Sequence, residues 1–91
     1  MQDFGQSAAW YRKAAEQGEA KAQNNLSLLY AKGRGIPQDF VLAYMWASLA
    51  ASQNSEYAEL RDLIAQKMTP QQVAEAQRLT REWKPKTSAS P

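Results

Sequence analysis

The sequence predicts an all-α protein: an α/α solenoid (superhelix) of two helix-turn-helix repeats followed by a C-terminal capping helix. The strongest observation is an internal repeat, because a set of residues returns 36 positions later without a gap. The first members are Asp3, Phe4, Trp10, Ala14, Ala15 and Gln17, and their counterparts are Asp39, Phe40, Trp46, Ala50, Ala51 and Gln53. A period of about 20–50 residues is typical of arrays in which each unit buries its apolar face against its neighbours. Apolar residues also recur at spacings of three and four, which indicates helices, and no segment reads as a strand.

The first repeat should contain two helices. The first is expected over about residues 4–17, with one face formed by Phe4, Ser7, either Trp10 or Tyr11, and Ala14. Gly18 then supplies a left-handed stop. The second helix is expected over about residues 20–32 and ends at Gly33. Its inward residues are Ala22, Leu26, Leu29 and Tyr30.

The second repeat begins after a turn from Gly33 to Asp39, in which at least one of Gly33 and Gly35 should have a positive φ. Asp39 is the expected N-cap of the third helix. That helix carries a stripe of Phe40, Ala43, Trp46, Ala47 and Ala50. The small alanines allow helices to approach closely, so the Trp46 ring is expected to fill the core beside them.

The last two helices should complete the domain. The fourth is expected over about residues 55–67, with Tyr57, Leu60 and Ile64 on one stripe. The fifth has Thr69 as N-cap, Pro70 at the first helical position and Gln72 three residues after the cap, which predicts a capping box. Its stripe is Val73, Ala76, Leu79 or Thr80, and Trp83.

These elements set the expected domain boundaries. The repeat domain should span residues 1–84, with one repeat over about 3–38, the next over about 39–68, and the capping helix over about 69–84. Pro85 should end the last helix. Residues 85–91 are expected to form a flexible tail, and Lys86 to Pro91 are expected to pack against nothing.

Composition excludes several kinds of chemistry. The 91 residues include no cysteine and no histidine, which removes thiolate metal sites, disulfides, cysteine nucleophiles and the usual partner of a catalytic serine. The net charge of +2 is too small to indicate nucleic-acid binding. Residues 64–91 alone carry +3, and Arg78, Arg81 and Lys84 are best explained as complements to a helix C-terminus. No apolar run approaches the roughly 20 residues of a membrane span, and no signal peptide is visible.

The residues of the first repeat resemble a known family. Residues 10–18, Trp-Tyr-Arg-Lys-Ala-Ala-Glu-Gln-Gly, resemble the first-helix signature of the Sel-one-like repeats (SLR), relatives of the tetratricopeptide repeats. The second helix and the glycine-rich turn are similar to the same family at Ala22, Gln23, Leu26, Tyr30, Gly33 to Ile36, Asp39 and Phe40. Ser27 stands where the family usually has glycine, and Ala47 follows Trp46 in place of tyrosine. The resemblance implies an interaction scaffold of the kind that serves complex assembly, signalling and envelope processes, often in bacteria.

Two clusters could suggest chemistry and are better explained by structure. Glu56, Glu59 and Asp62 share one helix face, but without a second converging element they are typical of a solvated face. The segment Gly33 to Gly35 lacks the lysine and the Ser/Thr of a phosphate-binding loop and follows a helix, so it is interpreted as a turn. We therefore expect no enzyme activity and no cofactor.

The resemblance also implies where a partner would bind. If the first helix of each pair lines the concave face, as in relatives, the candidate partner-binding residues are Arg12, Lys13, Glu16, Tyr44, Met45, Ser48 and Ser52. Tyr44 and Met45 could alternatively pack against the chain's own C-terminal cap. The expected function is a scaffold or adaptor for a protein or peptide. The alternative is a self-association module, a possible homodimer that packs through an uncapped N-terminal repeat.

The compartment does not follow from the sequence. A cytoplasmic location is favoured for the chain as given, and a periplasmic one if it is the C-terminal part of a longer secreted protein.

Overall fold

The computed structural model describes residues 3–86, and this part of the chain is helical and without strands. Its α-helices are α1 (Phe4–Glu16), α2 (Ala20–Lys32), α3 (Phe40–Gln53), α4 (Ala58–Ala65) and α5 (Pro70–Glu82). A short 3-10 helix, η1 (Ser55–Tyr57), precedes α4. The all-α solenoid predicted from the 36-residue period is confirmed.

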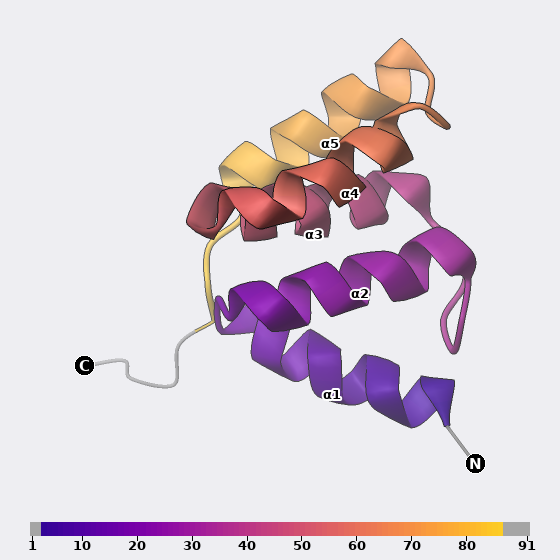
Figure 1. Cartoon of the computed structure of the whole chain (residues 1–91), viewed down its shortest axis with the longest axis vertical. Helices are drawn as coiled ribbons and strands as arrows, with labels where there is room; N and C mark the ends of the chain where they lie inside the picture. The colour runs from indigo at the N-terminus through magenta and orange to yellow at the C-terminus, as the bar shows by residue number, and fades with distance from the viewer. Residues whose placement is uncertain (1–2, 87–91) are drawn as a thin grey trace.

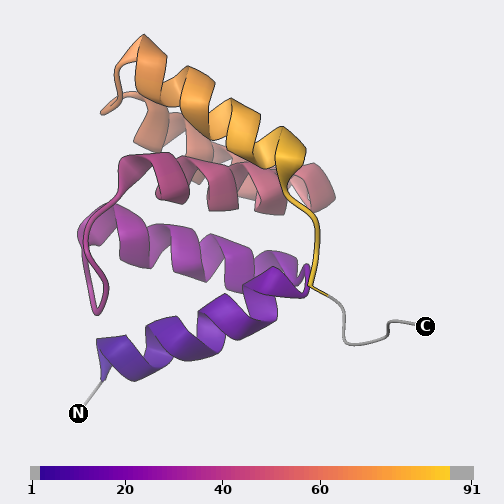
Figure 2. The ribbon, with the colours of Figure 1, turned by 180° about the vertical axis from the view of Figure 1, so that it is seen from behind.

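The helices α1, α2 and α3 stack in chain order, and both α4 and α5 pack on α3 (Figure 1). The helix α2 lies between α1 and α3 and runs antiparallel to both. The view from the opposite side shows that α4 and α5 cover different sides of α3 (Figure 2). Because α2, α4 and α5 all pack against α3, this helix is the centre of the fold.

Local sequence signals determine where α1, α3 and α5 begin. The carboxylate of Asp3 accepts a hydrogen bond from the Gln6 amide at 3.1 Å, and Asp39 accepts one from the Leu42 amide at 3.0 Å. The two first helices of the repeats are therefore capped in the same way, in register with the 36-residue period. The predicted capping box of α5 is present, with Thr69 as the N-cap.

The turn between the repeats requires glycine. Gly33 ends α2 with a φ of 68°, and Gly35 has a φ of 78°. A methyl group on Gly33 would also lie 3.1 Å from the Gln38 Cβ, which is closer than side chains normally approach. The prediction of a positive φ in this turn is confirmed at both glycines.

The core surrounds α3. Trp46 is 6% exposed, and the Trp83 ring packs edge-on against it with the ring centroids 5.9 Å apart. Between α2 and α3 the contact is close, because the buried Ser27 hydroxyl donates to the Ala43 carbonyl at 2.6 Å. Serine is small enough for this approach, and its hydroxyl is satisfied by the carbonyl of the facing helix.

The first helix differs from its predicted pattern in one respect. Ala8 and Ala15 are its buried residues, and Tyr11 is half-buried, whereas Trp10 is 69% exposed. Of the two aromatic residues considered for the inward face, Tyr11 is thus the inward one. Trp10 lies on the side of α1 opposite Ala8 and Ala15, where no described element covers it. The structure does not describe the side chain of Phe4.

Two boundaries also differ. The fourth helix is shorter than predicted, because Ser55–Tyr57 form the 3-10 helix and α4 ends at Ala65. Lys86, assigned to the unpacked tail, instead contacts the end of α1. Its amide donates to the Glu16 carbonyl at 2.6 Å, and its ammonium lies 3.4 Å from the Glu16 carboxylate. The rest of the predicted tail, residues 87–91, lies outside the described residues.

Candidate partner-binding surfaces

The predicted partner-binding residues do not form one surface. Tyr44 is 9% exposed and Met45 is 7% exposed, so both belong to the core and the prediction that they contact a partner is wrong. Their burial has a plain cause, since α3 is enclosed by α2, α4 and α5. The alternative of packing within the chain holds for both residues.

The five other predicted residues are wholly or partly accessible and differ in their contacts. The Arg12 guanidinium donates to the Tyr30 hydroxyl at 2.5 Å, and Glu16 is engaged by Lys86. The Ser52 hydroxyl donates to the carbonyl of Leu49 at 2.7 Å. Ser48 is half-buried, and its hydroxyl oxygen has no hydrogen-bond partner among the described residues. Lys13 is exposed beside Trp10.

Trp10 and Lys13 line a shallow hollow on α1. Its volume is about 210 Å³, and its lining residues are Gln6, Ala9, Trp10 and Lys13. From the sequence Trp10 was expected either on the inward face of the first helix or in the apolar surface of the first helix pair, and its hollow with Gln6, Ala9 and Lys13 was not predicted. The available signal was the spacing of Gln6, Trp10 and Lys13, which puts two polar residues on the same helix face as the tryptophan.

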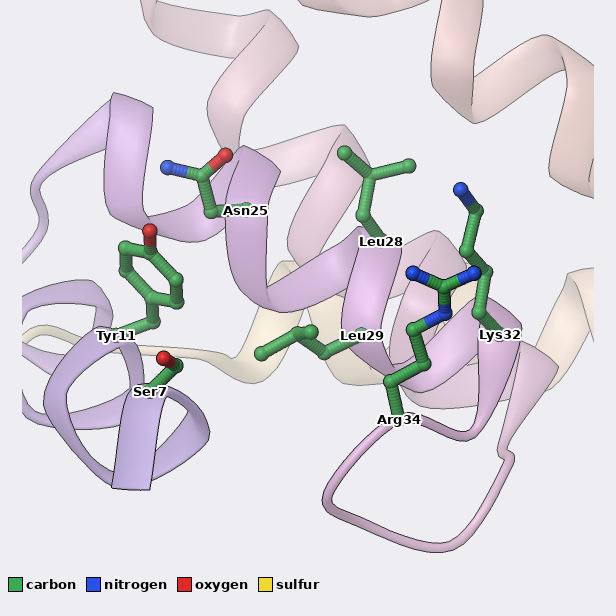
Figure 3. Close-up of a pocket in the computed structure, with 7 residues that line it drawn as sticks. All are labelled: Ser7, Tyr11, Asn25, Leu28, Leu29, Lys32 and Arg34. Carbon is green, nitrogen blue, oxygen red and sulfur yellow. The ribbon is translucent and has the colours of Figure 1, made fainter. Parts of the chain in front are cut away.

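A second hollow lies between α1 and α2 (Figure 3). Its volume is about 190 Å³, and it is lined by Ser7, Tyr11, Asn25, Leu28, Leu29, Lys32 and Arg34. Asn25 lies near Tyr11 at one end, and Lys32 and Arg34 lie on the side of the glycine turn. None of the lining residues is acidic. Ser7, Tyr11 and Leu29 were predicted from the sequence to face inward, whereas Asn25, Leu28 and Lys32 were not singled out, although these three follow helical spacing.

A third hollow, of about 280 Å³, separates α2 from α4. Its lining residues are Asn24, Leu28, Glu56, Tyr57, Glu59, Leu60 and Leu63. Glu56 and Glu59 are exposed there, as expected for a solvated helix face. Leu28 lines this hollow as well as the one between α1 and α2.

The basic residues of α5 are partly neutralised within the helix. The guanidinium of Arg78 is bound by the carboxylates of Glu75 and Glu82, the second at 2.9 Å. Hydrogen bonding to Glu75, and to a smaller extent to Glu82, raises the pKa of Arg78.

Residues 3–86 bring together no group of three or more acidic side chains that could hold a metal ion. Over the same residues, none of the helices combines the length and the apolar character that a bilayer crossing needs.

Stacked helical repeats with uncovered faces define a class of protein, the α/α solenoids. Within that class the sequence model of the Sel1 repeat matches residues 1–19 and 20–55, and the chain belongs to the Sel1 repeat family. Proteins with this fold are generally protein–protein interaction scaffolds and are typically not catalysts.

One similar solved structure is that of c5321, described as a protective antigen present in uropathogenic Escherichia coli strains and displaying an SLR fold. The two chains are 36% identical and superpose with a TM-score of 0.84 over 89% of this chain. The match spans only 18% of the c5321 chain. The comparison with curated proteins found no match.

Proposed function

We propose that this chain is a scaffold that binds a protein or peptide partner through the hollow beside Trp10. The supporting observation is the contrast between two tryptophans 36 positions apart, on helices that are capped by equivalent aspartates, Asp3 and Asp39. Trp46 is 6% exposed beneath Trp83, whereas Trp10 is 69% exposed. The second repeat thus shows which kind of group can cover a tryptophan at this position: an aromatic ring that packs edge-on against it.

The two repeats differ around their tryptophans in a way that favours reversible binding. The counterparts of Gln6, Ala9 and Lys13 are Leu42, Met45 and Leu49. In the second repeat Met45 and Leu49 are buried. In the first repeat Gln6 and Lys13 surround the tryptophan with polar groups. A polar rim around an apolar centre is typical of interfaces that form reversibly.

This proposal defines the chemistry of the partner. It should offer an aromatic side chain to Trp10, and an acidic side chain close by would pair with Lys13. Glu16 follows Lys13 by about one helical turn, whereas Arg12 lies on the side of α1 that faces α2 and donates to Tyr30. We propose that both contact a partner that extends beyond the hollow.

The test uses a synthetic peptide with the chain's own residues 80–86, blocked at both ends, in which Trp83 is the aromatic side chain. Titration into ¹⁵N-labelled protein should shift the indole signal of Trp10 in a saturable manner and leave the signal of Trp46 in place. A dissociation constant at or below about 1 mM corresponds to roughly 4 kcal/mol of binding free energy.

The matched control is the same peptide with alanine in place of the tryptophan, which should not bind. A second control is the protein variant Trp10→Gln, which should remain folded because the ring is exposed. If the peptide shifts other residues, or binds Trp10→Gln equally well, the hollow is not the binding surface.

Self-association through the first helix pair is a second candidate function. It is favoured by the exposure of the large Trp10 ring on α1. It predicts a monomer–dimer equilibrium at micromolar concentration in sedimentation equilibrium. Trp10→Gln should shift that equilibrium toward monomer.

A further inference from the structure

The first repeat has a second uncovered face, the hollow between α1 and α2 (Figure 3). Two of its lining residues, Ser7 and Tyr11, have Ala43 and Ala47 as their counterparts in the second repeat. Both alanines are completely buried. The helix α2 lies against this part of α3, because the Ser27 hydroxyl donates to the Ala43 carbonyl at 2.6 Å. In the second repeat, therefore, an α-helix covers the equivalent face.

We infer that the hollow between α1 and α2 is a docking surface for an α-helix of a partner protein, which lies antiparallel to α1. The orientation follows from the example within the chain, since α2 runs antiparallel to α3 (Figure 1). The C-terminal end of a helix docked in this way lies near the first turn of α1. Ser7 belongs to that turn, and Arg34 follows the end of α2, which lies near the start of α1 because the two helices are antiparallel (Figure 1).

The charges of the hollow fit the C-terminal end of a helix. The last turn of a helix has free carbonyl groups and a partial negative charge, which favour basic neighbours. Lys32 and Arg34 are exposed at this side of the hollow, and no acidic residue lines it. In the second repeat the positions 36 residues after Lys32 and Arg34 hold Met68 and Pro70, which are uncharged. The basic pair is thus specific to the uncovered face.

The contacts also define the side chains that the partner helix needs. The α2–α3 contact is close because Ser27, a small residue, faces Ala43. A helix docked on α1 needs alanine, serine or glycine opposite Ser7 for the same reason, and apolar residues that reach Tyr11 and Leu29. Acidic residues in its last turn add to the attraction by Lys32 and Arg34, and basic residues there oppose it.

This surface is independent of the hollow beside Trp10. Consecutive residues of a helix point about 100° apart, so Tyr11 and Trp10 open onto different sides of α1. A helix on one side and an aromatic side chain on the other can be bound together.

The probe for the test is a hydrocarbon-stapled peptide with the chain's own residues 19–32, the helix that covers the equivalent face of α3. The staple is placed away from Ser27, because an unstapled helix of this length is only marginally stable in water. One version ends in a free carboxylate, and a second ends in two added lysines and an amide. In titrations of the ¹⁵N-labelled full chain, the first version should shift the amides of Ser7, Tyr11 and Leu29 in a saturable manner, and the second should bind about 10-fold more weakly.

Protein variants separate this surface from its neighbours. Lys32→Glu combined with Arg34→Glu should weaken binding of the carboxylate version by about 10-fold, and Ser7→Arg should block the hollow with a similar loss. Lys21→Glu is the matched control, because Lys21 is an exposed lysine of the same helix and lines neither hollow. The affinity of the Lys21→Glu variant for the carboxylate version of the peptide should equal that of the wild type.

Four outcomes would overturn the inference. Three are the absence of saturable binding up to about 1 mM peptide, equal binding by the variant that carries both glutamates, and amide shifts confined to the Trp10 side of α1. Shifts of Ser7 and Tyr11 that follow the protein's own concentration without peptide would show that a second copy occupies the face, and would also contradict it. None of these results decides whether the hollow beside Trp10 binds its aromatic peptide, which is measured by the Trp10 indole signal.

Discussion

Replacing Trp46 by alanine tests the central feature of the fold, because the same substitution at Trp10 provides a matched control. The two residues are 36 positions apart and occupy equivalent places on α3 and α1. Trp46 is 6% exposed and carries the edge-on contact with Trp83, whereas Trp10 is 69% exposed. A repeat that behaved symmetrically would respond equally to both substitutions.

The structure predicts very different magnitudes. Truncation of a buried tryptophan costs about 3–5 kcal/mol, from lost burial and from the cavity that remains. The lost contact with Trp83 contributes about 0.5–1.5 kcal/mol of that cost. A domain of this length has a total stability of roughly 5–14 kcal/mol, so Trp46→Ala removes a large part of it. Trp10→Ala removes a solvated ring and should change the stability by no more than about 0.5 kcal/mol.

Thermal unfolding followed by far-UV circular dichroism measures the difference. For a domain of this size 1 kcal/mol corresponds to about 4–8 °C in the midpoint, so Trp46→Ala should lower the midpoint by roughly 10–40 °C or leave the chain largely unfolded. Trp10→Ala should stay within a few degrees of the wild type. A cooperative melt of Trp46→Ala close to the wild-type midpoint, or equal losses for both variants, would refute the assigned packing.

Three further substitutions test individual elements. Gly33→Ala should destabilise the chain by about 1 kcal/mol or more, because alanine is strained at a φ of 68° and its methyl group would crowd Gln38; a chemical denaturation curve that matches wild type would contradict this turn. Thr69→Ala removes the N-cap of α5 and should cost about 1 kcal/mol by the same measurement, and no loss would mean that the capping box contributes nothing. The double variant Gln6→Leu and Lys13→Leu gives the first repeat the residues of the second, and sedimentation velocity should then show increased self-association; an unchanged monomer would mean that the polar rim does not keep this face soluble.

Sequence reasoning succeeded where the determinants are local. The caps at Asp39 and Thr69 depend on a side chain and an amide three residues later, and both are present. The positive φ values of Gly33 and Gly35 likewise follow from the requirements of one turn. The 36-residue period was sufficient to define the stacking of the helices, because repeated units must bury equivalent faces.

Sequence reasoning failed where burial depends on a distant segment. Met45 is buried because α2, α4 and α5 all pack against α3. The apolar spacing within α3 does not indicate how many other helices cover it. The contact between Glu16 and Lys86 joins residues 70 positions apart, and the composition of the last residues had suggested an unpacked tail. For the same reason the residues that match best between the repeats, the two tryptophans, have opposite exposures.

The difference between the repeats determines where binding is expected. Asp3 and Asp39, which match between the repeats, maintain the fold by capping equivalent helices. Residues that differ lie on faces that are covered in the second repeat and open in the first: Lys13 replaces Leu49 beside the tryptophan, and Ser7 replaces Ala43 beside the neighbouring helix. Polar substitutions on an open apolar face lower the cost of leaving it in water and still allow it to be covered. A scaffold needs both properties, and we therefore propose that partners bind on the faces around Trp10 and Tyr11, where the neighbouring residues depart from the internal repeat.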